Sequence, residues 1–268
     1  MNKVLRNLGI PILSIVLLLL TWQAIVVGFH VDSFIAPRPL AAIASITGNW
    51  STLWPLLLGT IRETVYGFFC GAILGISLGV VMAKVRFIQK LIYPLLVLSQ
   101  AVPIIALATP LVLIFGLTIR PIIIVVAWIV FFPVTVSIVD GLSHVDPDLL
   151  NLAKVYGAGK FRTFWQIEVP ASVSPLFSGL KIGATYAVTG AIIGELASST
   201  GSNLAEFQQH ANANFNTAAV YGSTILMTIV GISWFLLVVA CEIWATPWLR
   251  RSTARRRRLR LRQAVAKR

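Results

Sequence analysis

The sequence predicts an all-α membrane protein with about six transmembrane helices. Hydrophobic residues make up 57% of the 268 residues and charged residues only 12%, whereas a soluble domain carries about 25% charged residues. The apolar residues gather in runs of the length that a helix needs to cross a bilayer, about 20 residues. Such a chain has too little charge to cover a surface facing water, which argues against a soluble enzyme. It also has too much apolar surface to remain disordered.

The first predicted span covers residues 10–29 and follows two basic residues, Lys3 and Arg6. Its apolar run is longer than that of a signal peptide and no small-residue cleavage site is evident, so we expect a retained helix. Residues 30–54 are mixed in composition and include two tryptophans near their end. Because Trp is favoured at membrane–water interfaces, this stretch is interpreted as an extracytoplasmic connection with a short amphipathic helix at the interface.

The second, third and fourth spans are predicted at residues 59–83, 91–117 and 121–139. Three prolines interrupt the third span, namely Pro94, Pro103 and Pro110. Proline is tolerated in a membrane helix where neighbouring groups satisfy the carbonyls that it frees. A re-entrant end of this span would change its boundaries without changing the number of crossings.

Residues 140–181 form the long polar stretch within the body of the chain. A short fifth span rich in Gly and Ala follows at residues 182–197, then a polar linker at 198–217 and the sixth span at 221–245. We therefore expect residues 140–181 to form a loop on one side of the membrane and the polar linker to lie on the other side.

The distribution of basic residues predicts the orientation, because Lys and Arg favour the cytoplasmic flanks of membrane helices. If the N-terminus is cytoplasmic and the chain crosses six times, only three of the 22 basic residues lie outside: Arg38, Arg62 and Arg120. The opposite orientation would place the other 19 there. Both termini and the 140–181 loop are therefore predicted to be cytoplasmic.

The composition also divides the chain into a membrane domain, residues 1–249, and a basic tail, residues 250–268. Ten of the 22 basic residues lie in that tail, directly after the sixth span, and the whole chain has a net charge of +13. No recognisable nucleic-acid-binding fold accompanies the tail. We therefore expect anionic membrane lipid, and no nucleic acid, as its partner.

A motif that predicts partner binding lies in the polar loop, where residues 151–183 read NLAKVYGAGKFRTFWQIEVPASVSPLFSGLKIG. The pattern predicts a short amphipathic helix around residues 148–156, a break at Gly157-x-Gly159, and a second helical piece over 161–167 that Pro170 ends. The apolar side chains of the second piece recur at helical spacing. Such a helix–Gly–helix segment suits docking into a groove on another protein, with apolar anchors and a charged rim.

The segment resembles the EAA loop of permease subunits in bacterial ABC importers, whose pattern is Glu-Ala-Ala, three residues, Gly, nine residues, Ile-x-Leu-Pro. Four residues match at the family spacing: Ala153, Gly157, Ile167 and Pro170. Asn151 stands where the family has Glu, Leu152 replaces the first Ala and Val169 the Leu. Without the Glu, we do not expect any ion pair that family members make with their ATPase through this residue, whereas the shape of the loop is expected to be intact. The segments FIAPRP, SPLFSGLKIG and IIGELASSTG resemble the branch that imports sulfonates, taurine, nitrate or vitamin precursors.

This resemblance implies a type I ABC importer permease of MetI-like fold in the bacterial inner membrane. Two permeases, identical or paired with a second kind, would enclose the substrate path, and an extracytoplasmic binding protein would deliver the substrate. Two ATP-binding subunits would dock on residues 148–170, and ATP binding would switch the helices between two states. The chain has no G-x-x-x-x-G-K-[ST] loop to hold phosphate, so we expect no cofactor, no catalytic residue and no enzymatic activity of its own. The residues assigned to ATPase coupling are Asn151, Ala153, Lys154, Gly157, Ala158, Phe161, Ile167 and Pro170.

Polar and small residues inside the spans have two interpretations each. Gly67, Gly71, Gly75 and Gly79 recur every four residues and let another helix approach closely, either within one subunit or at a contact that moves during transport. Glu195 lies either along the path or gate or in a structural hydrogen bond, since an ionisable group at membrane depth faces protein or water. Gln100, beside Pro103, is a second candidate for the path. Arg62 and Glu63 are interpreted as an interfacial pair.

Other polar clusters predict no chemistry. Asp140, Asp146, Asp148 and His144 match no trusted metal-ligand spacing, so we expect solvated residues and no metal. Cys70 and Cys241 each lie within an apolar run and are interpreted as small core residues without a disulfide.

Two further functions are alternatives to an importer subunit. An ion-coupled secondary transporter favours internal repeats and charged residues in the middle of spans, and neither is clear in this sequence. An intramembrane enzyme needs paired acids or a Ser/His pair inside the spans, and the sequence predicts no such pair.

Overall fold

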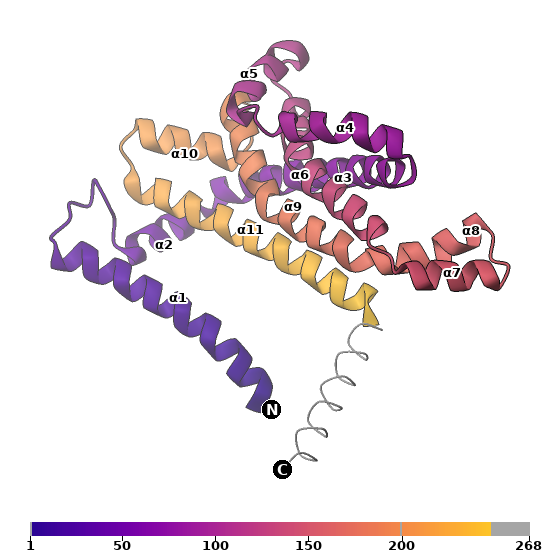
Figure 1. Ribbon diagram of the computed structural model, residues 1–268. Helices are drawn as coiled ribbons and strands as arrows, with labels where there is room; N and C mark the ends of the chain where they lie inside the picture. The colour runs from indigo at the N-terminus through magenta and orange to yellow at the C-terminus, as the bar shows by residue number, and fades with distance from the viewer. Residues whose placement is uncertain (1, 199, 248–268) are drawn as a thin grey trace.

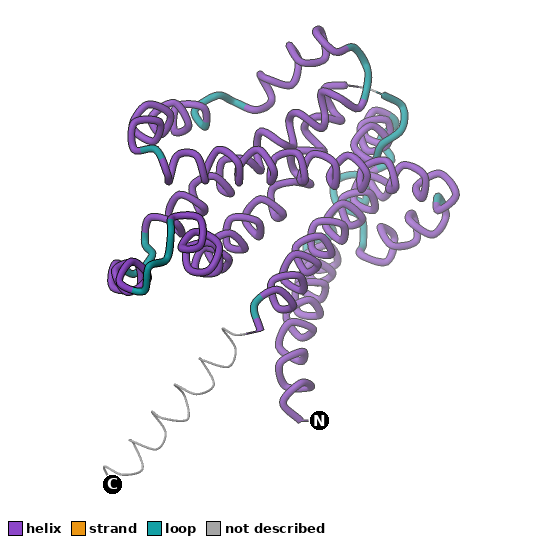
Figure 2. Tube along the Cα trace, turned by 90° about the vertical axis from the view of Figure 1, so that its right-hand side faces the viewer, coloured by secondary structure: helices purple, strands orange, loops and turns teal. Residues whose placement is uncertain are grey.

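The computed structural model describes residues 2–198 and 200–247, with side chains from residue 13 onward. Every regular element in this part of the chain is helical, which confirms the all-α prediction, and the connections are short (Figure 2). The helices are α1 (Asn2–Gly28), α2 (Pro39–Gly48), α3 (Trp50–Lys84), α4 (Arg86–Ser99), α5 (Ile104–Phe115), α6 (Ile119–Ser143), α7 (Pro147–Val155), α8 (Lys160–Thr163), the π-helical turn η1 (Phe164–Glu168), α9 (Val169–Ser198), α10 (Leu204–Ala213) and α11 (Thr217–Ala245).

Four helices of the described chain are long and apolar enough to cross a membrane: α3, α6, the continuous stretch Lys160–Ser198 that contains α9, and α11. The bent pair of α4 and α5 makes a fifth crossing if it is counted as one span. The apolar part of α1 with described side chains, Leu13–Gly28, is shorter than a full span, so the first predicted span, residues 10–29, stays a prediction. The predicted basic tail, residues 250–268, lies outside the described residues.

Helices α3 and α6 run parallel and in close contact, as the four glycines of α3 show. Gly67 of α3 faces Val126 of α6, and Gly79 faces Ile138. Each second residue lies about three turns after the first on its own helix, so the two helices run in the same direction. An added Cβ on Gly71 would lie 2.7 Å from the carbonyl oxygen of Ala127. The glycine stripe therefore packs against α6 within one subunit, where the absence of side chains brings the two backbones together.

We expect Gly71→Ala to destabilise the protein. Its methyl carbon would lie 2.7 Å from the Ala127 oxygen, so the two helices must separate, and overpacking of this kind costs about 1–3 kcal/mol. Gly231→Ala in α11 is the matched control, because nothing lies nearer than 3.9 Å to an added Cβ there. Thermal unfolding in detergent measures the difference, and equal midpoints for the two variants would contradict this packing.

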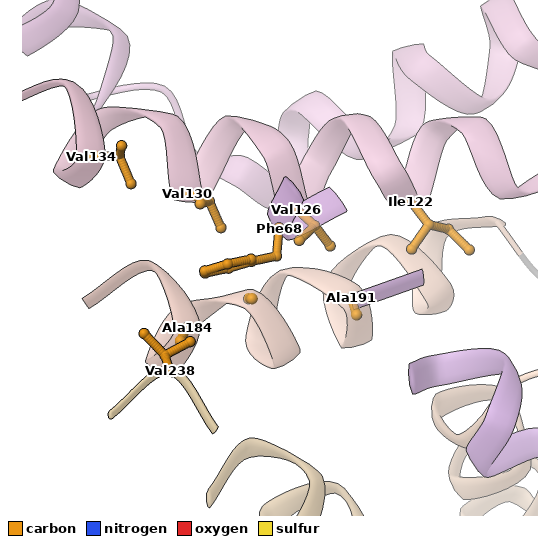
Figure 3. Close-up of a cluster of buried hydrophobic side chains, with 9 residues drawn as sticks. Phe68, Ile122, Val126, Val130, Val134, Ala184, Ala191 and Val238 are labelled. Atoms are coloured by element: carbon orange, nitrogen blue, oxygen red, sulfur yellow. The ribbon is translucent and has the colours of Figure 1, made fainter. Parts of the chain in front are cut away.

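Helix α9 runs antiparallel to α6. Gly194, near its end, faces Ile122 at the start of α6, and Gly183 faces Val130 further along. Between these helices lies the main apolar core (Figure 3), in which residues of α6 four positions apart, Ile122 to Val134, meet alanines of α9. Phe68 of α3 completes this core. The most buried helix of the bundle, α6, is therefore held between α3 and α9.

The parallel arrangement of α3 and α6 requires the chain between them to return across the bundle. Helices α4 and α5 make this return, although they meet at an angle of 96°. At the other end of the chain, Thr217 Oγ1 donates a hydrogen bond of 2.7 Å to the Phe34 carbonyl, so the chain leaving α1 lies beside the start of α11. These directions agree with the alternation predicted for the second to sixth spans, whereas a crossing by α1 stays a prediction.

The prediction of one third span at 91–117 is wrong in its shape. The chain breaks over residues 100–103 and Pro103 caps the start of α5. Proline has no N–H for the helical ladder and disfavours helical backbone in the residue before it, so the break falls directly before Pro103. Pro94 and Pro110, in contrast, are accommodated inside α4 and α5.

Pro170 does not end a helix, contrary to the prediction. The N–H of Val169 donates to the carbonyl of Phe164, five residues back, in the turn η1. This wider turn shifts the hydrogen-bond ladder just before the proline, which cannot donate. The helix therefore continues from η1 into α9, and the fifth span is longer than the predicted 182–197. The linker predicted at 198–217 also contains a helix, α10, whose N-cap Asn203 accepts a hydrogen bond from the Glu206 N–H.

Candidate functional site

The segment from α7 to η1, residues 147–168, projects from the end of the bundle (Figure 1). We call it the docking segment. Helix α7 begins at Pro147, and the side chain of Asp146 caps it by accepting a hydrogen bond of 2.9 Å from the Asp148 N–H. The predicted helix at 148–156 is therefore present, with its end at Val155.

Gly157 turns the chain at the end of α7. Its φ of +73° lies in the left-handed region, which favours glycine. The Gly157 N–H donates to the carbonyl of Lys154 and the Ala158 N–H donates to the carbonyl of Ala153. These two bonds are a Schellman motif, which satisfies the free carbonyls at the end of a helix. The family glycine is thus required by backbone conformation, since open space surrounds it.

The docking segment exposes a row of large apolar side chains. Val155 and Tyr156 are more than 80% exposed, Phe161 is 78% exposed and Trp165 is 55% exposed. Ala153, in contrast, is buried on the inner face of α7. Lys154, Lys160 and Arg162 lie beside the apolar row, as does the exposed Asn151. A protruding surface of this composition fits a protein groove with an acidic rim.

Lys84, the last residue of α3, fixes the docking segment to the bundle. Its Nζ forms an ion pair with Glu168 and lies 4.8 Å from the centroid of the Phe164 ring. A hollow of about 670 Å³ lies between α3 and the segment. The sequence pattern did not predict this anchor. The sequence offers one signal for the anchor, because Glu168 is the one acidic residue between Asp148 and Glu195.

A second constellation lies at the opposite end of the bundle, where Glu63 of α3 and Glu195 of α9 are both buried, at 1% and 0% exposure. The two carboxyl groups lie close enough to interact with each other. The prediction that Glu63 forms an interfacial pair with Arg62 is wrong in its location, because the helical register of α3 turns Glu63 into the bundle. The structure also contains a pair of acids within the spans, which the sequence analysis did not predict because the two residues are far apart in the chain.

Glu195 and Thr60 hold the start of α10. Glu195 Oε2 accepts a hydrogen bond of 3.0 Å from the Ala205 N–H, and Thr60 Oγ1 accepts one of 3.2 Å from the Leu204 N–H. These bonds satisfy N–H groups in the first turn of α10, which have no partner within the helix. The structural hydrogen bond considered for Glu195 is therefore present, and the path assignment of Glu195 stays a prediction.

The comparison with known families decides what kind of protein carries this docking segment. The family described as binding-protein-dependent transport system inner membrane component matches residues 71–251, which include all of α6 to α11. The chain belongs to this family. It is an ABC importer permease of the MetI-like type, a multi-pass inner membrane protein, and its family consists of transport subunits that are not themselves enzymes. Import systems of this family generally include an ATPase and a binding protein.

Curated relatives cover nearly the whole permease. A probable ABC transporter permease protein of Haemophilus influenzae is 28% identical over 89% of this chain and 94% of its own. The formylaminopyrimidine transport permease protein ThiX of Halalkalibacterium halodurans is 29% identical over 89% and 95% of the two chains. The riboflavin transport system permease protein RibX of Chloroflexus aurantiacus is 27% identical over 90% of each. Membership of this family supports an ABC importer, and not an ion-coupled secondary transporter, as the class of transporter.

The remaining predicted residues of the permease lie apart from both constellations. Gln100 is exposed at the bend between α4 and α5, where its Nε2 contacts Ser99 Oγ at 3.2 Å, and its place on the path stays a prediction. Asp140 pairs with His144 at 3.0 Å, and both are exposed. No group of three metal-ligating residues occurs in the described chain. Cys70 and Cys241 are exposed, contrary to the prediction of core residues, because apolar helix faces of a membrane protein also face outward.

A second ion pair joins two spans of the permease near the end that carries the docking segment. Lys181 Nζ of α9 lies 2.9 Å from Glu242 Oε2 of α11. We expect Lys181→Ala to destabilise the permease by about 1–2 kcal/mol, because it leaves the mostly buried Glu242 carboxylate without its partner.

The reversed pair, Lys181→Glu with Glu242→Lys, is the matched control and is expected to recover most of that loss. Thermal unfolding in detergent at low salt measures all three proteins. If Lys181→Ala unfolds at the same temperature as the unaltered permease, the ion pair has no stabilising role.

Proposed function

We propose that this permease works as one of two membrane-spanning subunits of an ATP-driven importer, and that the docking segment couples it to ATP-binding subunits. The observation that carries the proposal is the exposed apolar row from Val155 to Trp165, which projects from the bundle and is anchored by the Lys84–Glu168 ion pair. Motion of a partner that grips this row would reach α3 through the ion pair and α9 through the continuous helix at η1.

The docking segment faces the cytoplasm in this proposal, and so do both termini. Lys84, Lys154, Lys160, Arg162 and Lys181 all lie at its end of the bundle, which the positive-inside rule places on the cytoplasmic side. ATP is bound and hydrolysed by the partner subunits, and this chain carries no cofactor. The path lies between two permeases, identical or of two kinds, with a binding protein at the opposite face.

The substrate is proposed to be a small organic nutrient of the pyrimidine or riboflavin type. The names of two relatives with 27–29% identity, the formylaminopyrimidine and riboflavin permeases, support this class. A taurine permease of Escherichia coli, at 23% identity, supports a sulfonate as the second choice.

Reconstitution tests the function directly. The permease is co-expressed with an ATPase and a binding protein encoded beside it, purified and placed in liposomes, and uptake of the ligand of that binding protein is followed. We expect uptake that requires ATP on the side of the docking segment. Uptake without the ATPase, or labelling of a Val155→Cys variant from the extracytoplasmic side of cells, would overturn the proposal.

A further inference from the structure

A groove between α9 and α11 carries several hydroxyl and amide groups among its apolar lining side chains. It has a volume of about 610 Å³. Its polar lining consists of Thr185, Thr189, Gln208, Thr224 and Thr228. Two other hollows, between α3 and α6 and between α3 and α11, are lined almost entirely by apolar side chains. Such lining is expected of faces that meet lipid or another helix.

The groove lies within the membrane-spanning part of the bundle. Thr185 is one helical turn from Lys181, whose ion pair with Glu242 joins α9 and α11 at one end. Gln208 of α10 lies at the other end, where its Nε2 donates a hydrogen bond of 2.7 Å to Thr224 Oγ1. The threonine hydroxyls that bond within their own helices cost little against lipid, yet four hydroxyl oxygens and a glutamine amide on one open face favour contact with water or a polar solute.

The hydrogen bonds inside the groove indicate which solutes it suits. The hydroxyls of Thr185, Thr224 and Thr228 donate to carbonyls of their own helices at 2.8–2.9 Å, so their oxygens act as acceptors. The oxygen of Thr224 already accepts from Gln208. No charged side chain lines the groove. It therefore offers acceptors to a solute that carries N–H or O–H groups, and offers no counter-charge to an anion.

We propose that this threonine groove is a section of the substrate path, and that it suits uncharged solutes bearing N–H and O–H donors. The inference rests on the proposed function and deepens it, because it assigns a surface and a chemical class to the path. Donor-bearing heterocycles fit this lining, whereas a sulfonate or nitrate would pass it without a cationic partner.

Thiol labelling of the assembled complex tests the groove without knowledge of the substrate. Cys70 and Cys241 are first replaced by Ser, and Thr189→Cys and Thr228→Cys are introduced singly. Ser77→Cys, in the apolar hollow between α3 and α6, is the matched control. We expect membrane-impermeant methanethiosulfonates to label the two groove variants about tenfold faster than the control, because the reacting thiolate forms poorly in apolar surroundings.

The charge of the reagent tests the solute class. Rates with an ammonium-bearing and a sulfonate-bearing methanethiosulfonate are each divided by the rate for a free thiol in solution. We expect the corrected rate of the sulfonate reagent to be the lower one in both groove variants. A faster sulfonate reagent would overturn the proposed class.

If the cysteine variants fail to assemble, uptake measurements on other groove variants test the proposal instead. Thr189→Val with Thr228→Val removes two hydroxyls at nearly constant shape, and we expect slower uptake with unchanged ATPase binding, whereas Ser77→Ala changes neither. The groove would be a dry contact between helices or subunits if its thiols reacted as slowly as the control thiol. Unchanged uptake in the double valine variant would show the same. Either result would overturn the groove while ATP-dependent uptake by the unaltered complex still supported the proposed function.

Discussion

Phe161→Asp is expected to abolish ATP-driven uptake by the reconstituted importer. Phe161 is 78% exposed on the docking segment, and its ring lies 6.2 Å from the Trp165 ring between centroids. An aromatic anchor in a protein interface contributes about 2 kcal/mol or more, and a buried unpaired carboxylate adds to its loss. We expect co-purification of the ATP-binding subunits to fall at least about 30-fold.

Two controls separate docking from folding in that experiment. Phe161→Leu keeps an apolar side chain and is expected to retain most uptake. The aspartate variant is expected to reach the membrane in normal amounts and to melt with the unaltered permease, because the side chain is exposed in the isolated chain. Full uptake by Phe161→Asp would remove the docking segment from the coupling mechanism.

Glu195→Leu is expected to release α10 from the bundle and to stop transport. The substitution removes the acceptor of the Ala205 N–H and the polar neighbour of Glu63, whose Oε2 has no hydrogen-bond partner within the described chain. Each buried polar group left without a partner costs about 1–3 kcal/mol. We expect a lower melting temperature and faster amide hydrogen exchange at residues 204–208, measured in lipid nanodiscs by mass spectrometry.

Glu195→Gln is the matched control for this network. Its carbonyl oxygen can still accept from Ala205, and its amide can donate to Glu63, so we expect stability and exchange near those of the unaltered permease. If the leucine and glutamine variants exchange and melt alike, the hydrogen bond to Ala205 does not hold α10.

The sequence was sufficient for the features that depend on local composition. A run of apolar residues must cross or enter the membrane wherever the chain goes, so most spans and their alternation followed from hydropathy and basic flanks. The spacing of Ala153, Gly157, Ile167 and Pro170 likewise identified the docking segment. Gly157 could be recognised because the turn at φ +73° is a property of one residue and its neighbours.

Features that join distant parts of the chain required the tertiary structure. Local pattern placed Glu63 at an interface, whereas packing of α3 against α9 buries it beside Glu195, 132 positions later. Pro170 was expected to break a helix, and the π-helical turn before it allows the helix to continue.

The threonine groove belongs to the same class of feature. Thr189 and Thr228 lie on two spans, and each alone is an unremarkable hydroxyl in an apolar helix. Hydropathy states only whether a segment prefers lipid or water, because it averages over all sides of a helix. Which side meets protein, lipid or a polar groove is decided by the rotation and neighbours of each helix, and these are settled when the helices pack.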